Sequence, residues 1–68
     1  MQLSVCVNGQ AMQVPAGASV AALVELLKLH PRRIAVERNQ RLLPRLEYAS
    51  TPLQEGDVLE IVTLVGGG

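Results

Sequence analysis

Near the start of the chain, Asn8-Gly9 joins two short segments in which apolar and polar residues alternate. The first runs from Leu3 to Val7 and the second from Ala11 to Val14. Asn-Gly fits a two-residue hairpin turn because both turn positions need a positive φ angle, which these two residues adopt at low cost. The sequence therefore predicts that the chain opens with a β-hairpin.

One amphipathic helix is expected after the hairpin. The segment 15–18 breaks the second strand, and Ser19 stands where its hydroxyl can accept a hydrogen bond from a free amide of the first helical turn. Apolar residues then recur at the spacing of a single helix face, at Val20, Leu23, Val24 and Leu27, with Leu26 and Leu29 widening the stripe. We expect His30-Pro31 to end the helix, with His30 interacting with its last carbonyls.

The second half of the chain predicts two more strands. Ile34 to Val36 is a short strand signal, which we expect to be a parallel or edge strand, and Asn39-Gln40 provides a turn after it. The stretch between Pro44 and Pro52 predicts irregular structure or a short helical turn, in which Tyr48 packs against the core. After a turn at 54–57, residues 58–65 are mostly apolar and rich in β-branched side chains, which predicts the central strand.

This order of elements predicts an α+β fold of the β-grasp, or ubiquitin-like, kind. We expect a mixed sheet of four to five strands with one main helix packed on one face, and a right-handed crossover that sets the third strand parallel to the second or the first. A chain of 68 residues has room for one hydrophobic core. We therefore expect one β-grasp domain over residues 1–65 and a flexible C-terminal glycine tail over residues 66–68.

The last strand predicts a binding surface. If Leu59 and Ile61 face the helix, the alternating positions Val58, Glu60, Val62 and Leu64 face the other side of the sheet, where the sequence offers nothing to cover the apolar ones. An exposed apolar patch on so small a protein marks a site for a partner. The candidate partner-binding residues are Val58, Val62, Leu64 and Val65.

Charge and composition exclude several classes of function. Six basic and six acidic residues give no net charge, which argues against nucleic acid and anionic membranes as partners. Five arginines between residues 32 and 45 form either a solvated face or a docking patch for an acidic partner. The single cysteine, Cys6, is expected to be a small buried hydrophobe. Since neither a signal peptide nor a membrane-spanning run is visible, we expect a cytoplasmic location.

No group of residues in the sequence has the spacing of a metal site or a catalytic centre. We therefore expect no metal and no catalysis by the chain itself. The final strand runs directly into Gly66, Gly67 and Gly68, which lack a Cβ and can enter a slot that any side chain would block. On this interpretation the reactive group is the terminal carboxylate of Gly68; the alternative is a frayed or cloned tail.

The chain resembles the ThiS family of ubiquitin-like sulfur carriers along its whole length. The similar segments are Val7-Asn8-Gly9, the helix led by Ser19, residues 36–39, Glu55-Gly56-Asp57, and residues 60–68. The resemblance implies a sulfur carrier in thiamine (thiazole) biosynthesis that serves other enzymes as a co-substrate. An E1-like enzyme, ThiF, would use ATP with magnesium to adenylate Gly68, and sulfur from a cysteine desulfurase would convert it to a thiocarboxylate. Thiazole synthase, ThiG, would then receive the sulfur.

The same resemblance implies that Gly66 and Gly67 give Gly68 access to its partners, that the chain binds no cofactor, and that it is monomeric when free. Three alternatives remain open. A MoaD-like carrier would use the same terminus to deliver sulfur for molybdopterin. A ubiquitin-like modifier would be joined to target lysines, although its single lysine, Lys28, leaves little scope for chain building. A plain β-grasp interaction domain would have an inert tail.

Overall fold

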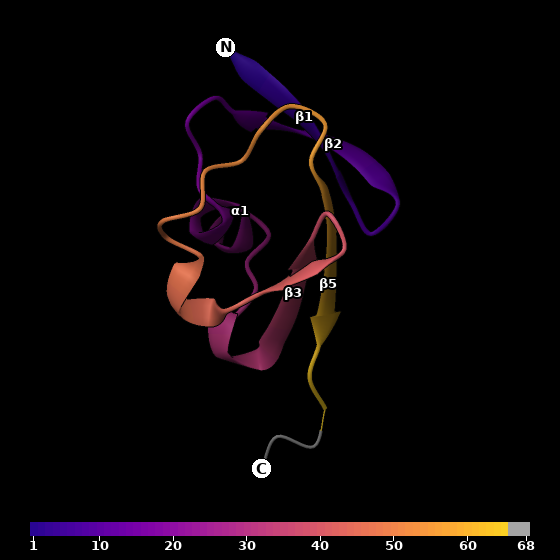
Figure 1. Ribbon diagram of the computed structural model, residues 1–68, viewed down its shortest axis with the longest axis vertical. Coiled ribbons are helices and arrows are strands. Elements are labelled where there is room, and N and C mark those ends of the chain that lie inside the picture. The colour runs from indigo at the N-terminus through magenta and orange to yellow at the C-terminus, as the bar shows by residue number, and fades with distance from the viewer. Residues whose placement is uncertain (66–68) are drawn as a thin grey trace.

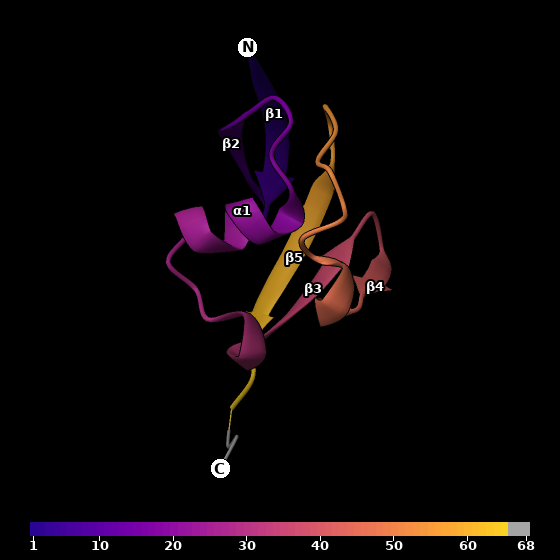
Figure 2. The same ribbon diagram turned by 90° about the vertical axis from the view of Figure 1, so that its left-hand side faces the viewer.

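A computed structural model describes residues 1–65 of the chain (Figure 1). These residues form a five-stranded mixed sheet in the order β2-β1-β5-β3-β4, and α1 lies across one face of it (Figure 2). The elements are β1 (Gln2–Val7), β2 (Gln10–Pro15), α1 (Val20–Leu26), the 3₁₀ helix η1 (Pro31–Arg33), β3 (Ile34–Arg38), β4 (Arg41–Leu43), the 3₁₀ helix η2 (Arg45–Glu47) and β5 (Val58–Thr63). The predicted β-grasp architecture is confirmed. The predicted tail, 66–68, lies outside the described residues.

The opening hairpin forms where the sequence predicts it. β1 and β2 pair antiparallel from Gln2 opposite Pro15 to Val7 opposite Gln10. Asn8 and Gly9 have φ angles of 50° and 83°, as a two-residue turn of this hand requires. β1 also pairs in parallel with β5, which therefore lies in the middle of the sheet, as predicted.

The helix begins as predicted but ends early. The Ser19 hydroxyl accepts a hydrogen bond from the Ala22 N–H at 3.1 Å, so Ser19 is the N-cap. Lys28 has a φ of 60°, and the N–H groups of Lys28 and Leu29 donate to the carbonyls of Glu25 and Val24. This pair of bonds is the Schellman pattern, which closes the helix at Leu27.

Two predictions about α1 and the residues after it are wrong. Leu26 is 53% exposed because α1 turns it away from the sheet, so it does not widen the buried stripe. The His30 side chain makes no hydrogen bond to the last carbonyls of α1; its Nδ1 accepts a hydrogen bond from the Arg32 N–H at 3.3 Å and caps the start of η1. Pro31 is thus the first residue of a new short helix, where a proline is favoured.

β3 is neither a parallel strand nor an edge strand, which corrects the prediction. It lies between β5 and β4 and is antiparallel to both. It runs in the same direction as β2, as one of the two predicted arrangements requires, but it pairs with neither β2 nor β1. The reason is that the segment after α1 carries the chain to the far end of the sheet, so Ile34 starts β3 opposite Thr63 at the end of β5.

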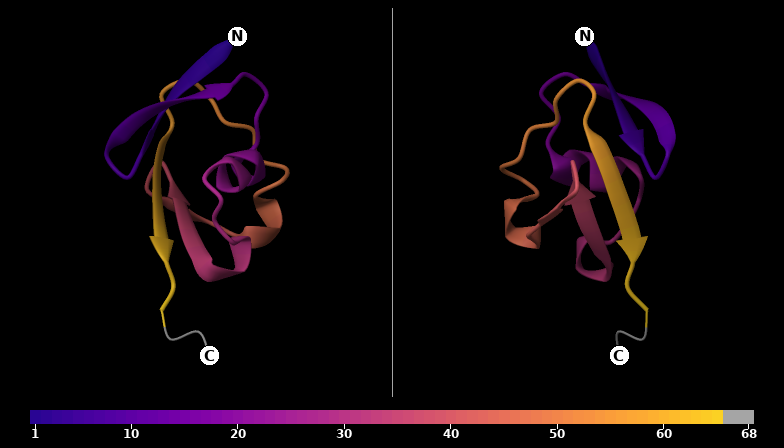
Figure 3. Two further views of the ribbon diagram at one scale, coloured as in Figure 1. Left: turned by 180° about the vertical axis from the view of Figure 1, so that it is seen from behind. Right: turned by 45° about the vertical axis from the view of Figure 1, so that its right-hand side comes forward.

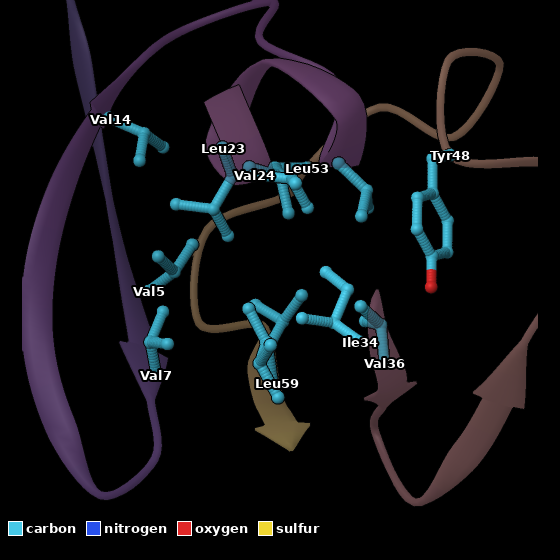
Figure 4. Close-up of a cluster of buried hydrophobic side chains, with 12 residues drawn as sticks. Val5, Val7, Val14, Leu23, Val24, Ile34, Val36, Tyr48, Leu53 and Leu59 are labelled. Carbon is cyan, nitrogen blue, oxygen red and sulfur yellow. The ribbon is translucent and has the colours of Figure 1, made fainter. Parts of the chain in front are cut away.

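The core lies between the sheet and α1 (Figure 4). Tyr48 is buried in it, as predicted, and directly follows η2, which confirms the short helical turn that was one of the two expectations for this stretch. Cys6 is only half-buried, because it alternates with Val5 and Val7 and faces the side of the sheet away from α1. The buried apolar residues are Val5, Val7, Val14, Val20, Leu23, Val24, Ile34, Val36, Tyr48, Leu53, Leu59 and Ile61.

Candidate functional site

β5 presents apolar side chains on the face of the sheet that α1 does not cover. Leu59 and Ile61 are buried beneath α1, while Val58 is exposed, Val62 is 55% exposed and Leu64 is 52% exposed. Val65, which follows, is 91% exposed. The structure thus brings the four residues predicted for partner binding together along one strand and its continuation. We call Val58, Val62, Leu64 and Val65 the outer patch.

Within residues 1–65, the end of β5 is hydrogen-bonded to the rest of the domain on one side only. The Leu64 N–H donates to the Arg33 carbonyl at 2.8 Å, which continues the β3–β5 pairing one residue past the strand. Gly66 follows Val65 directly in the sequence. The outer patch therefore leads without a spacer to the predicted site of chemistry at Gly68, which, with Gly66 and Gly67, lies outside the described residues.

Asn8 has a second role that the sequence did not reveal. Its Oδ1 accepts from the Ile61 N–H at 2.8 Å, and its Nδ2 donates to the Ile61 carbonyl at 3.0 Å. The side chain thus takes the place of one further residue of β1 beside β5. The local sequence pattern indicates only the turn for Asn8, since nothing nearby signals a contact with a residue 53 positions later.

Asp57 holds the start of β5. Its carboxylate accepts hydrogen bonds from Arg38 Nε at 2.9 Å, Asn39 Nδ2 at 3.1 Å and the Gln54 N–H at 2.9 Å. Burial raises the pKa of Asp57, but the hydrogen bonds from Gln54, Asn39 and Arg38 outweigh it, so the pKa lies below its ordinary value. The sequence predicted a turn here but missed this anchor. The pairing also removes Arg38 from any basic docking patch, whereas Arg32, Arg33, Arg41 and Arg45 are exposed.

Two carboxylates face each other on the outer side of the sheet. Glu37 and Glu60 are direct partners in the β3–β5 register, and both are exposed. Like charges placed opposite one another destabilise a sheet. The only salt bridge found among residues 1–65 joins Arg38 to Asp57, so this acidic pair is not neutralised within that part of the chain.

Residues 1–65 offer no evident centre for catalysis. They contain no cluster of three or more His, Cys, Asp or Glu side chains placed to hold a metal ion. A shallow groove of about 640 Å³ between α1 and η2 is lined mainly by apolar residues, and Glu25 is the one carboxylate among them. In the same part of the chain, no helix is long and apolar enough to cross a membrane.

These features define a class of protein: a small β-grasp domain whose central strand carries an exposed apolar patch and continues toward a glycine terminus. The chain belongs to the ThiS family, whose sequence profile matches residues 5–68. A protein from Escherichia coli named sulfur carrier protein ThiS is 33% identical over 66 residues, which cover 97% of this chain and 100% of that one. The predicted membership in the ThiS family is confirmed.

A solved structure and a longer protein are also similar to this chain. The crystal structure of a thiamine biosynthesis protein (ThiS) from Geobacter metallireducens superposes with a TM-score of 0.83 at 29% identity, covering 97% of this chain and 100% of that chain. A thiazole synthase from Paramagnetospirillum magneticum is 38% identical over 66 residues. That match covers 97% of this chain, which spans only 20% of the thiazole synthase.

Proposed function

We propose that this chain is a sulfur carrier of thiamine biosynthesis, with Gly68 as the residue that bears the sulfur. The observation that carries the proposal is the ThiS family match, which extends through residue 68 and so includes the three glycines. The name of the Escherichia coli relative supports the carrier role, in which the chain is a co-substrate and the partner enzymes are the catalysts. On this proposal residues 66–68 form a slender tail on the β-grasp domain 1–65.

The chemistry follows from the properties of a carboxylate. An ionised carboxylate is a poor electrophile, so it must first be activated. In the ThiF-type enzyme, a Gly68 carboxylate oxygen would attack the α-phosphorus of ATP and release pyrophosphate, with magnesium offsetting the phosphate charge. Sulfide, or a persulfide whose S–S bond a thiol then reduces, would attack the acyl carbon and release AMP. The product is a thiocarboxylate at Gly68.

Each part of the site has a role in this sequence of reactions. Gly66 and Gly67 would let the main chain enter a narrow active site, because a Cβ at either position would make the chain too wide to enter. The outer patch would bind the adenylating enzyme, since the free energy falls when a partner covers exposed valine and leucine side chains. The sulfur would originate from a cysteine desulfurase.

We propose thiazole synthase as the second partner. A protein named thiazole synthase contains a segment similar to 97% of this chain, which supports an association between the two activities. The thiocarboxylate would be the nucleophile that transfers sulfur to the thiazole precursor. Transfer to a molybdopterin precursor, or attachment to lysines of other proteins, would be an alternative fate of the same activated terminus.

Incubation of the chain with ATP, magnesium, a ThiF-type enzyme and a sulfur source tests the proposal. We expect the intact mass to rise by the difference between one sulfur atom and one oxygen atom, and we expect thiazole to form when thiazole synthase is added together with the precursors that supply the ring carbons and nitrogen. Thiazole formation without molybdopterin formation by a molybdopterin synthase large subunit supports the thiamine branch. An unchanged mass with competent enzymes would show that the proposal is wrong.

A further inference from the structure

Among the residues that the structure describes, the edge of β5 that faces β1 is paired along only part of its length. The Asp57 carbonyl accepts from the Cys6 N–H at 2.9 Å, and the Leu59 carbonyl accepts from the Asn8 N–H at 2.9 Å. β1 ends at Val7, and the Asn8 side chain then occupies both the N–H and the C=O of Ile61. The pairing of β5 on this side therefore stops at Asn8.

The next two residues on this edge are Thr63 and Val65. Peptide groups alternate between the two edges of a strand, and on the β3 side the Val58 carbonyl and the Leu64 N–H are bonded to Asn39 and Arg33. The N–H and C=O groups of Thr63 and Val65 thus point away from β3. Within residues 1–65 neither residue pairs with β1 or with any other segment on that side. Figure 3 shows β5 continuing past the end of β1.

An unpaired strand edge recognises another extended main chain, because its N–H and C=O groups match those of a second strand. Folded proteins commonly protect such an edge with a lysine, a proline, a bulge or a covering element. Residues 62–65 contain neither a lysine nor a proline, and all four residues are exposed. The edge that runs from Thr63 to Val65 is therefore open to a partner strand; we call it the open edge.

We propose that an extended segment of the adenylating enzyme pairs with the open edge and adds a strand beside β5. The inference rests on the proposed function. Val65 lies three residues before Gly68, so a strand held here lies close to the carbon that reacts with ATP. Strand pairing fixes the direction and the register of the main chain, and this would aim the tail at the nucleotide. It uses main-chain groups only and leaves the side chains of the outer patch free for other contacts.

Replacing Val65 by proline tests this pairing, with alanine as the matched control. Both variants lose the valine side chain, but only Val65→Pro also removes the N–H. Val65 is exposed and its N–H has no partner within residues 1–65, so both variants should fold. We expect Val65→Pro to bind a ThiF-type enzyme about three- to tenfold more weakly than Val65→Ala, the effect of one lost hydrogen bond. Equal affinities would overturn the proposal.

Amide hydrogen exchange of the unaltered chain gives a second, independent test. We expect the Thr63 and Val65 amides to exchange at least about tenfold more slowly once the enzyme is bound, because each becomes a hydrogen-bond donor. Unchanged exchange in a sample whose intact mass still shows thiocarboxylate would overturn the open-edge proposal and leave the carrier function standing. Slow exchange that depends on concentration without enzyme would identify a second copy as the occupant and also overturn it. If the chain gains no sulfur at all, both the carrier function and the open-edge proposal are wrong.

Discussion

Truncating Val62 and Leu64 together to alanine should weaken binding of the adenylating enzyme while leaving the fold intact. Fully burying a valine or leucine side chain contributes about 1.5–3 kcal/mol. Val62 is 55% exposed and Leu64 is 52% exposed, so roughly half of that free energy, about 1 kcal/mol for each residue, is still available to a partner that covers them. The double variant should therefore lose about 2 kcal/mol of binding free energy, which corresponds to a roughly 30-fold higher Kd.

Isothermal titration calorimetry with a ThiF-type enzyme measures this change directly. Leu46→Ala is the matched control, because Leu46 is 89% exposed but lies on η2 beside α1, away from the outer patch. We expect the control to bind as the unaltered chain does. We also expect the free energies of unfolding of all three proteins, measured in urea, to lie within about 1 kcal/mol of one another, because substitutions of exposed residues usually change stability little. A double variant whose Kd stays within about threefold of that of the control would refute the assignment of the outer patch.

Three other outcomes concern stability and are measured by urea unfolding. Because the pKa of Asp57 is lowered in the folded state, its carboxylate adds to the free energy of unfolding above the unfolded pKa, and this stabilisation is lost as pH falls below about 4. Asp57→Asn should therefore make the free energy of unfolding fall less steeply in acid. An equally steep fall would contradict the role of Asp57 as an anchor of β5. Lys28→Gly should raise the free energy of unfolding by up to about 1 kcal/mol because glycine adopts a φ of 60° without strain, and a loss of stability would contradict the helix end described. Glu60→Gln should add about 0.2–1 kcal/mol by removing the repulsion from Glu37, whereas a decrease would show that the two carboxylates do not repel.

The sequence predicted the elements whose signals are local. Asn8-Gly9 between alternating segments located the hairpin, and Ser19 located the start of α1, because turn and cap preferences act over a few residues. The alternation of Leu59 and Ile61 with Val58 and Val62 correctly separated the buried from the exposed face of β5. The outer patch could therefore be found before the fold was known.

The features that the sequence did not predict depend on contacts between distant segments or on a residue in an unusual role. A helix end of this kind normally carries glycine, so Lys28 at a positive φ gave no warning that α1 stops at Leu27. The hydrogen bonds that Asp57 accepts from Arg38 and Asn39 join residues that are 19 and 18 positions apart, respectively. The position of β3 depends on which strand fills the centre of the sheet. None of these can be read from a local pattern.

Top-down mass spectrometry of the reacted protein shows directly whether Gly68 carries sulfur. The full chain, ATP, magnesium, a ThiF-type enzyme and a sulfur source are incubated together, and the intact protein is then fragmented. We expect one oxygen to be replaced by sulfur, with the added mass in the C-terminal fragments that contain Gly68, and we expect the chain that lacks Gly68 to gain none. Sulfur found on Cys6 instead, or an unmodified terminus with active enzyme present, would show that Gly68 does not carry the sulfur.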